Sequence, residues 1–230
     1  MGVSSKKLEV CAESVESALI AQTEGAYRVE LCGSLIEGGT TPSYAQIKIA
    51  REKLSIKLYV IIRPRGGNFL YNGLEFDIMK EDIHKCGEIG CNGIVIGILH
   101  ADGSIDKSRT AQLVAIAKSY SMGVTFHRAF DVCNDLFIGL NDVIETGCER
   151  ILTSGGKSIA PEGTSVIKKL IELAGDRIIV MPGSGLTPEN IVKVAKSTNA
   201  MEFHGTFKES TSFRTDPKKV QNALMAIGAI

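Results

Sequence analysis

Two short stretches of the sequence place an acid and a thiol on one side of a predicted strand. In LEVC near the N-terminus, Glu9 and Cys11 alternate with apolar residues. In RVELC, Glu30 and Cys32 repeat this arrangement. Each pair shares a face because successive side chains of a strand point to opposite sides. Carboxylates act as general acids or bases, and two close thiolates suit a soft ion such as Cu(I).

The cysteine pair has two interpretations that the sequence leaves open. Cys11 and Cys32 lie at matching positions on consecutive strands, which are neighbours about 5 Å apart in a parallel barrel, so their sulfurs could come close enough to hold Cu(I). A buried cysteine is also a small hydrophobic residue, and nearby Glu9 and Glu30 disfavour thiolates unless a cation offsets them. The six cysteines of the chain form no C-x-x-C pair, so we expect reduced thiols.

Strand-like and helical patterns alternate along the 230 residues. Apolar residues return every three or four positions in segments such as 14–25, 75–90 and 161–175, which is typical of helices that cover a sheet. Strict alternation indicates a parallel sheet, and eight units predict an α/β fold closed into a single-domain (β/α)8 TIM barrel over residues 1–230. The strands are predicted at 8–11, 28–32, 57–63, 93–99, 123–128, 150–154, 177–182 and 200–204.

In such a barrel the chemically active side chains lie at the carboxyl ends of the strands and in the loops that follow. The sequence places charges of both signs there, which favours acid–base chemistry on a small anionic molecule. The catalytic candidates are Glu9, Glu30, His127, Glu202 and His204. Isolated buried ions are costly, so we expect these acids to face Arg63, Arg128 or a histidine. The alternative is a polar plug that only closes the barrel with salt bridges.

Anion binding is predicted at the same mouth. Arg63 and Arg65 would steer the anion electrostatically. The turns TSGG (153–156) and MPGSGLTPEN (181–190) expose backbone N–H groups that can hold a phosphate or carboxylate, and barrels often bind phosphate near their last strands. These glycines could instead serve only to permit tight turns. The anion-binding candidates are Arg63, Arg65, Arg128, Asp131, Thr153, Ser154, Gly155, Gly183, Ser184 and Gly185.

Charge and hydropathy argue against several classes of partner. The chain carries 26 basic and 26 acidic side chains without a basic stripe, which disfavours nucleic acid or an anionic membrane as a partner. No apolar run is long enough to span a bilayer, and the first residues lack the apolar core of a signal peptide. We therefore expect a cytoplasmic protein.

The motifs resemble the CutC copper homeostasis family over nearly the whole chain. The matching segments are VESA, RVELC, EGGTTPS, IRPRGGNFLY, MKEDI, TFHRAFD, ERILTSGG and EFH. The resemblance implies a cytoplasmic (β/α)8 barrel that binds copper and contributes to copper tolerance. It also implies a homo-oligomer, either a dimer or a tetramer. The Cu(I)-binding cysteines proposed for the family fall on Cys11 and Cys32 of this sequence.

Besides an interaction scaffold whose barrel mouth is vestigial, two functions therefore remain open from the sequence. One is a protein that holds Cu(I) through Cys11 and Cys32 for buffering or distribution. The other is an enzyme that acts by acid–base chemistry on a small anion, with or without a phosphate group. The resemblance favours the first, whereas the residues favour the second because a copper carrier has no need of so many charged groups at one mouth. The fold does not decide between them, because barrels host many functions.

Overall fold

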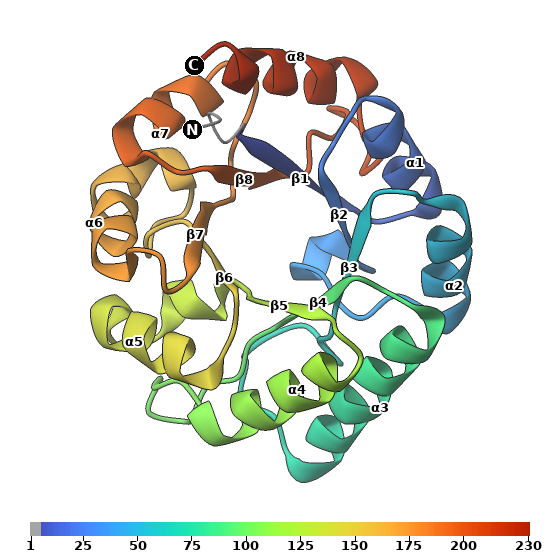
Figure 1. Cartoon of the computed structure of the whole chain (residues 1–230), viewed down its shortest axis with the longest axis vertical. Coiled ribbons are helices and arrows are strands. Elements are labelled where there is room, and N and C mark those ends of the chain that lie inside the picture. Colours follow the sequence, from blue (N-terminus) through green and yellow to red (C-terminus); the bar gives the residue numbers. More distant parts are fainter. Residues whose placement is uncertain (1–5) are drawn as a thin grey trace.

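The computed structural model describes residues 6–230, which form eight parallel strands and eight α-helices in strict alternation. The strands are β1 (Lys7–Ala12), β2 (Arg28–Leu31), β3 (Lys57–Ile61), β4 (Gly93–Ile96), β5 (Gly123–Phe126), β6 (Arg150–Thr153), β7 (Ile179–Pro182) and β8 (Glu202–Gly205). They are hydrogen-bonded in the order β7-β6-β5-β4-β3-β2-β1-β8, and β8 returns to lie beside β7 (Figure 1). The predicted (β/α)8 TIM barrel is confirmed.

The helices surround the strands as an outer ring (Figure 1). They are α1 (Val15–Thr23), α2 (Tyr44–Lys53), α3 (Gly73–Ile89), α4 (Lys107–Ser119), α5 (Leu136–Thr146), α6 (Thr164–Ala174), α7 (Ile191–Thr198) and α8 (Pro217–Gly228). Side chains cap several of their first turns. At α3, for example, Asn72 and Glu75 each accept a hydrogen bond from the backbone N–H of the other. Across residues 6–230, none of these helices has the length and apolar character needed to cross a membrane.

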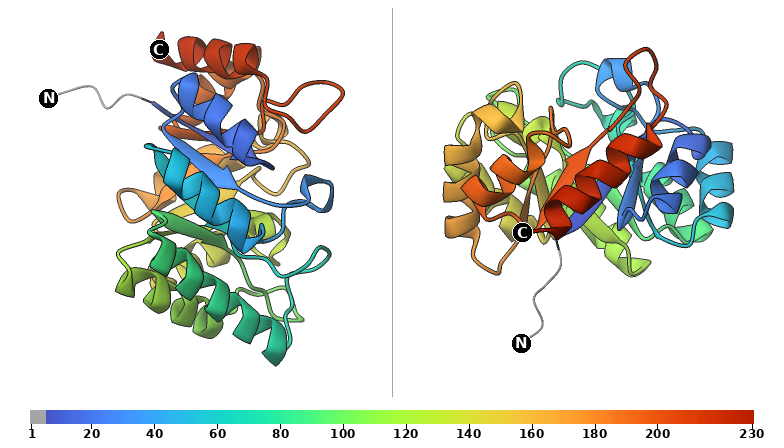
Figure 2. Two further views of the ribbon diagram at one scale, coloured as in Figure 1. Left: turned by 90° about the vertical axis from the view of Figure 1, so that its right-hand side faces the viewer. Right: turned by 90° about the horizontal axis from the view of Figure 1, so that it is seen from above.

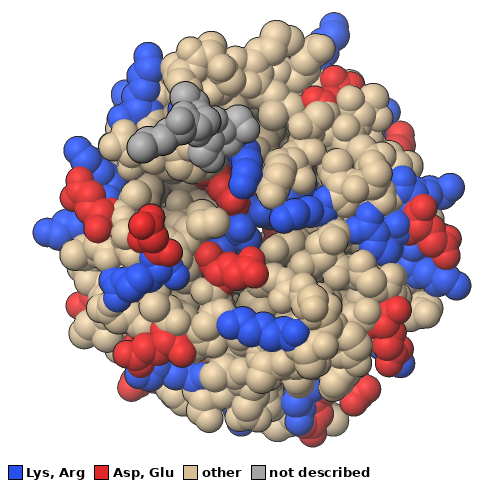
Figure 3. All heavy atoms as spheres, in the orientation of Figure 1, with Lys and Arg blue, Asp and Glu red and all other residues tan. Residues whose placement is uncertain are grey.

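The strands all begin at one end of the barrel, and the long βα loops project from the opposite end (Figure 2). These loops include three short 3-10 helices, η1 (Leu35–Glu37), η2 (Arg128–Val132) and η3 (Ala160–Glu162), and the segment 206–216 between β8 and α8. Figure 3 shows the end at which the strands begin, where basic and acidic side chains are interspersed. The loops that could form a site therefore lie at the other end, as expected for this fold.

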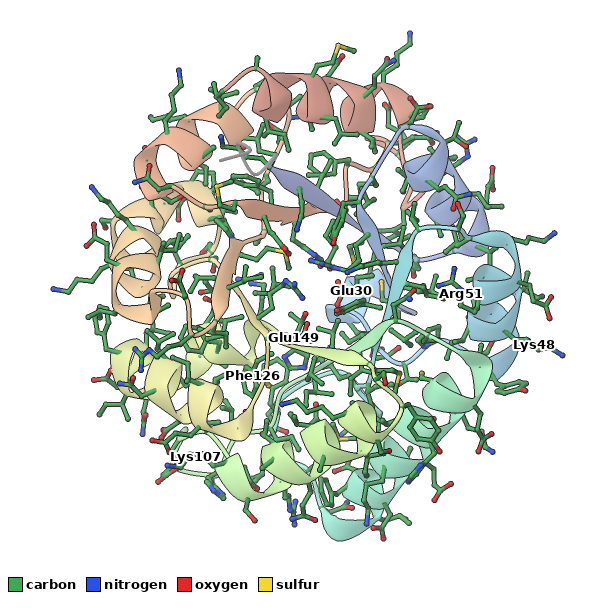
Figure 4. The ribbon with its side chains drawn as sticks, viewed as in Figure 1. Glu30, Lys48, Arg51, Lys107, Phe126 and Glu149 are labelled. Carbon is green, nitrogen blue, oxygen red and sulfur yellow. The ribbon has the colours of Figure 1, made fainter. Side chains whose placement is uncertain are left out.

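The apolar core lies between the sheet and the helices. Outward-facing strand residues such as Leu8, Val10 and Val29 are fully buried there, packed with helix residues such as Ile83. Burial of each such side chain contributes about 1.5–3 kcal/mol, so this layer stabilises the barrel without any contribution from its interior. The interior instead combines buried charged residues with a smaller apolar cluster that includes Tyr59, Ile61 and Val95, and Glu30 lies within the ring of strands (Figure 4).

Candidate functional site

A pocket of about 840 Å³ opens at the carboxyl ends of the strands, a size that suits a small molecule. Strand ends supply its inner part, and the βα loops supply its rim. Predicted site residues that line the pocket are Cys11, Glu30, Cys32, Arg63, His127, Arg128, Asp131, Ser184, Gly185 and His204. The pocket therefore gathers both cysteines and many of the predicted charged groups into one cavity.

The two cysteines meet in the inner part of the pocket. Their sulfur atoms lie 3.5 Å apart, and both thiols are free and buried. The predicted matching positions are wrong, because Cys11 on β1 is in register with Glu30 on β2. Cys32 follows β2, and its backbone N–H donates to the carbonyl of Ala12. The sulfurs approach each other from two different levels of the barrel, so the predicted proximity is confirmed although the register differs.

The Cys11 thiol resists ionisation in this setting. Its hydrogen bond with Cys32 raises its pKa well above the usual value, and burial and the neighbouring Glu30 carboxylate act in the same direction. Cys11 is therefore a neutral thiol at neutral pH, and a bound metal ion would have to displace its proton.

His204 connects the cysteines to the acids. Its Nδ1 lies 2.6 Å from Glu9 Oε1, and its Nε2 lies 3.5 Å from Glu30 Oε2. Burial alone would lower the His204 pKa, but the hydrogen bond to Glu9 and the charges of Glu30 and Glu9 outweigh burial and raise it. Burial also raises the pKa of Glu30. One donor atom each from Cys11, Glu30 and His204 lie within 4.8 Å of one another, a spacing that could hold a metal ion.

Two arginines inside the barrel were not singled out from the sequence. Arg28 is 1% exposed; its Nε donates to Glu9, and its Nη2 donates to Glu202 Oε2 at 2.7 Å. Arg150 Nε donates to the same Glu202 oxygen at 2.7 Å. The expectation that the acids face Arg63, Arg128 or a histidine is therefore wrong for Glu202, whereas Glu9 and Glu30 do face a histidine, His204. Strand alternation could have found Arg28, because it stands two residues before Glu30 on the same inward face.

The depth of two acids in the barrel also differs from the expectation. Glu202 begins β8, so it lies toward the end where the strands start and does not line the pocket. Glu9 also lies below the pocket lining, although its contact with His204 connects it to the site. Burial opposes ionisation of Glu9, but the charges and hydrogen bonds of Arg28 and His204 together outweigh burial and lower its pKa. Glu9 therefore stays ionised and serves to hold His204 and Arg28.

Arg63 and His127 both line the pocket, unlike the acids that Arg28 pairs. The two Nη atoms of Arg63 donate to the backbone carbonyls of Glu37, Gly39 and Gly67. His127 Nδ1 accepts a hydrogen bond from a backbone N–H in η2 at 3.1 Å. Burial and the nearby Arg63 charge lower the pKa of His127 to about 3, so its ring is neutral at physiological pH.

The first predicted anion-binding turn is occupied by a side chain of the protein. The Asp131 carboxylate accepts hydrogen bonds from the backbone N–H groups of Ser154 and Gly156 at 2.9 and 3.1 Å, and from the Thr153 hydroxyl at 2.5 Å. It also pairs with Arg128 at 2.8 Å. The N–H and O–H donors of this turn are thus already bound to Asp131, so they are not free to bind a ligand.

The other anion candidates are divided between the pocket and its surroundings. Ser184 and Gly185 line the pocket, whereas four residues of the two turns lie outside its lining: Thr153, Ser154, Gly155 and Gly183. Arg65 also lies outside, where its Nε pairs with Glu75 at 2.5 Å. Arg65 therefore does not face the cavity as the sequence suggested.

Comparison with known proteins gives consistent matches along the chain. The CutC family matches residues 6–209. The chain is 51% identical over 201 residues to the family protein CutC of Chromobacterium violaceum, which covers 87% of this chain and 81% of that protein. It is 45% identical over 222 residues to the copper homeostasis protein cutC homolog of Homo sapiens, which covers 96% of this chain and 80% of the human protein.

A solved structure agrees with these matches. The crystal structure of CutC from Streptococcus agalactiae is similar to this chain with a TM-score of 0.82 and 38% identity. The match covers 87% of this chain and 98% of the other. The similarity therefore extends over nearly the entire barrel.

Proposed function

Since this chain belongs to the CutC family of copper homeostasis proteins, we propose that it binds Cu(I) through Cys11 and Cys32. The observation that carries this proposal is the 3.5 Å separation of two free sulfurs in the inner part of the pocket. Soft thiolate ligands favour soft ions such as Cu(I). The copper ion is the cargo of the protein in this proposal, held for buffering or distribution.

Groups around the sulfurs support a metal ion at this position. His204 and Glu30 offer further donor atoms close to Cys11. A histidine that binds a metal usually donates its other ring N–H to a carboxylate, and Glu9 is placed to accept such a bond from His204 Nδ1. Arg28 in turn holds Glu9. The chain of contacts from Arg28 to His204 would fix the orientation of the ring toward the metal.

Metal binding would change the protonation of the site. Cys11 is a neutral thiol without a metal, so binding of Cu(I) as a dithiolate would release protons. Copper affinity should therefore rise with pH.

An anaerobic Cu(I) titration against a competing chelator tests this proposal. We expect the reduced wild type to bind one equivalent and the Cys11→Ser/Cys32→Ser variant to lose it. A matched control exists in Cys86 and Cys91, a second pair of buried cysteines that lies outside the pocket lining. The Cys86→Ser/Cys91→Ser variant should retain Cu(I). Equal loss of copper from the wild type and the Cys11→Ser/Cys32→Ser variant would contradict the proposal.

A second candidate function is acid–base chemistry on a small anionic substrate. It is favoured by Glu30, whose raised pKa suits a proton donor, and by His204 Nε2 at 3.5 Å from it. Glu9, Glu202 and His127 would support this pair rather than exchange protons with substrate. Glu30→Gln should then abolish turnover of the substrate while the fold persists. Equal turnover by Glu30→Gln and wild type would exclude this role for Glu30.

We also propose that the protein acts in the cytoplasm as a homo-oligomer, a dimer or a tetramer. Six free cysteines are typical of a reducing compartment. Apolar side chains such as Ile36 and Leu74 are highly exposed and would suit a contact between copies. Light scattering after size-exclusion chromatography measures the mass in solution, and a monomer would contradict the proposed assembly.

A further inference from the structure

We propose that the pocket contains a second subsite, beside the cysteine pair, in which Arg63 and His127 bind the carboxylate of a small organic acid. This subsite goes beyond Cu(I) binding, because none of its donors belongs to the proposed copper site. It rests on two buried N–H groups that have no hydrogen-bond partner among residues 6–230.

Arg63 is the first of these groups. It is 4% exposed and lines the pocket, yet it forms no ion pair with a carboxylate of residues 6–230. Its Nη1 donates to the carbonyls of Glu37 and Gly39 at 2.7 and 2.8 Å, and its Nη2 donates to that of Gly67 at 2.9 Å. Its Nε has no partner among these residues. A buried cation without a counter-ion is costly, so an anion in the pocket would relieve this cost.

His127 is the second group. It is 5% exposed and lines the same pocket. The backbone N–H of Ala129 donates to its Nδ1, so the proton of the neutral ring resides on Nε2. This Nε2–H group is buried and has no hydrogen-bond partner within the described part of the chain. Buried donors are almost always paired in native proteins, so an orphan donor at a pocket indicates a missing acceptor.

The two donors both lie beside Phe69, which also lines the pocket. The Arg63 guanidinium lies 5.0 Å from the centre of the Phe69 ring, and the His127 ring centre lies 5.0 Å from the same point. The His127 ring also packs against Gly97, where an added Cβ would stand only 2.4 Å from its Cε1. Arg63 is anchored by three carbonyls and His127 by a backbone N–H and Gly97. Both donors are therefore held in place before a ligand binds, which lowers the cost of binding.

The charge and the N–H donors of Arg63 and His127 identify the chemical class of the ligand. One guanidinium charge and two N–H donors match a single carboxylate, which has one charge and two acceptor oxygens. Beyond Arg63, the lining carries no net positive charge, because it holds the cations Arg128, Lys208 and Lys219 and the acids Glu30, Glu37, Asp131, Glu189 and Glu209. Apolar residues of the lining can contact a hydrocarbon body, namely Leu35, Ile61, Phe69, Leu152 and Phe207. A monocarboxylate with a small apolar body fits this combination better than a phosphate dianion.

Benzoate is a suitable probe, and histidine side-chain NMR of the full-length protein provides the readout. We expect saturable binding with a shift of the His127 Cε1–H resonance. His127→Asn keeps an acceptor for the Ala129 N–H but removes the Nε2–H donor. Arg63→Gln removes the charge. Each substitution should weaken benzoate binding by about tenfold or more, since a hydrogen bond to a charged group is lost. Arg65→Gln, which alters an arginine outside the pocket lining, should bind as wild type does.

Three results would overturn the proposal: no saturable binding of benzoate to the wild type, unchanged affinity in His127→Asn, or inorganic phosphate binding at His127 in preference to benzoate. His127→Asn carries the test even if Arg63→Gln fails to fold after loss of its loop contacts. The Cys11→Ser/Cys32→Ser variant should retain benzoate binding while it loses Cu(I). The subsite and the copper proposal can therefore fail independently.

Discussion

The two ends of the barrel interior differ in whether their buried charges have ion-pair partners. Toward the end where the strands begin, Arg28 and Arg150 bind Glu9 and Glu202 in a network in which each charge has a partner. At the loop end, the Arg63 guanidinium has no counter-ion among residues 6–230. Both ends are buried, so the difference is one of pairing. Paired charges close the barrel, whereas unpaired donors and free thiols mark the part for which we propose ligand binding.

The polar plug and the reactive site, which were alternatives from the sequence, occupy two different regions of the barrel interior. The polar plug that the sequence raised as an alternative describes the network around Arg28. The acids and thiols that could act on a ligand lie one layer higher, around Cys11, Glu30 and His204. A plug and a site thus coexist along the same strands, because alternate inward positions of one strand lie at successive depths.

The largest effect should come from breaking the paired network. Arg28→Met leaves the buried carboxylates of Glu9 and Glu202 without their shared cation, and removal of one partner from a buried ion pair costs about 3–5 kcal/mol. Urea unfolding measures the free energy of unfolding. A loss below about 1 kcal/mol would show that the network does not stabilise the barrel and would remove the contrast between the two ends.

A smaller loss should follow from filling the space beside His127. In Gly97→Ala, the new Cβ would stand 2.4 Å from His127 Cε1, and such overpacking typically costs about 1–3 kcal/mol. Displacement of the ring should also weaken benzoate binding. Gly73→Ala is the control, because nothing lies within 4 Å of a Cβ at that position. Equal unfolding energies and benzoate affinities for the two variants would contradict the packing described for His127.

The buried, neutral ring of His127 also predicts that the stability of the fold depends on pH. Its folded pKa is about 3 against a usual value of 6.5, so the unfolded chain binds the proton more tightly and stability falls as pH drops from 6.5 toward 3. Each pH unit costs at most about 1.4 kcal/mol. Unfolding measured between pH 6.5 and 5 should show a shallower decline in His127→Asn than in wild type. Parallel curves would mean that His127 is not a buried neutral donor.

The smallest effect is expected outside the pocket. Arg65→Gln removes an ion pair with Glu75 in which the arginine is more than one-third exposed, and such pairs contribute about 0–1 kcal/mol. The free energy of unfolding should therefore change by less than about 1 kcal/mol. A loss as large as that of Arg28→Met would show that burial does not distinguish the two arginines.

The sequence predicted which face each residue occupies better than how deep it lies. Alternation placed Glu9 with Cys11 and Glu30 with Cys32 correctly, because the period of a strand is fixed. The relative level of two strands depends on the stagger of the barrel, which no single strand reveals. Cys11 therefore faces Glu30 rather than Cys32 in register, and Glu202 lies below the pocket.

Contacts between segments far apart in the sequence were the other feature that could not be predicted from the sequence. The TSGG turn has the composition of an anion site, but Asp131 from the preceding βα loop occupies its N–H groups. Arg28 was overlooked although alternation places it inside with Glu30, because a basic residue at the start of a strand is usually exposed. The fold followed from local periodicity, whereas the partners of each buried charge required the three-dimensional structure.

The most direct test of the central claim is copper K-edge X-ray absorption of the Cu(I)-loaded, reduced protein. The account predicts two sulfur ligands in the wild type and in Cys86→Ser/Cys91→Ser, and none in Cys11→Ser/Cys32→Ser. A spectrum with only nitrogen and oxygen ligands in the wild type, or sulfur ligands that persist in Cys11→Ser/Cys32→Ser, would contradict it. In that case the free thiols in the inner part of the pocket would be packing residues rather than a copper site.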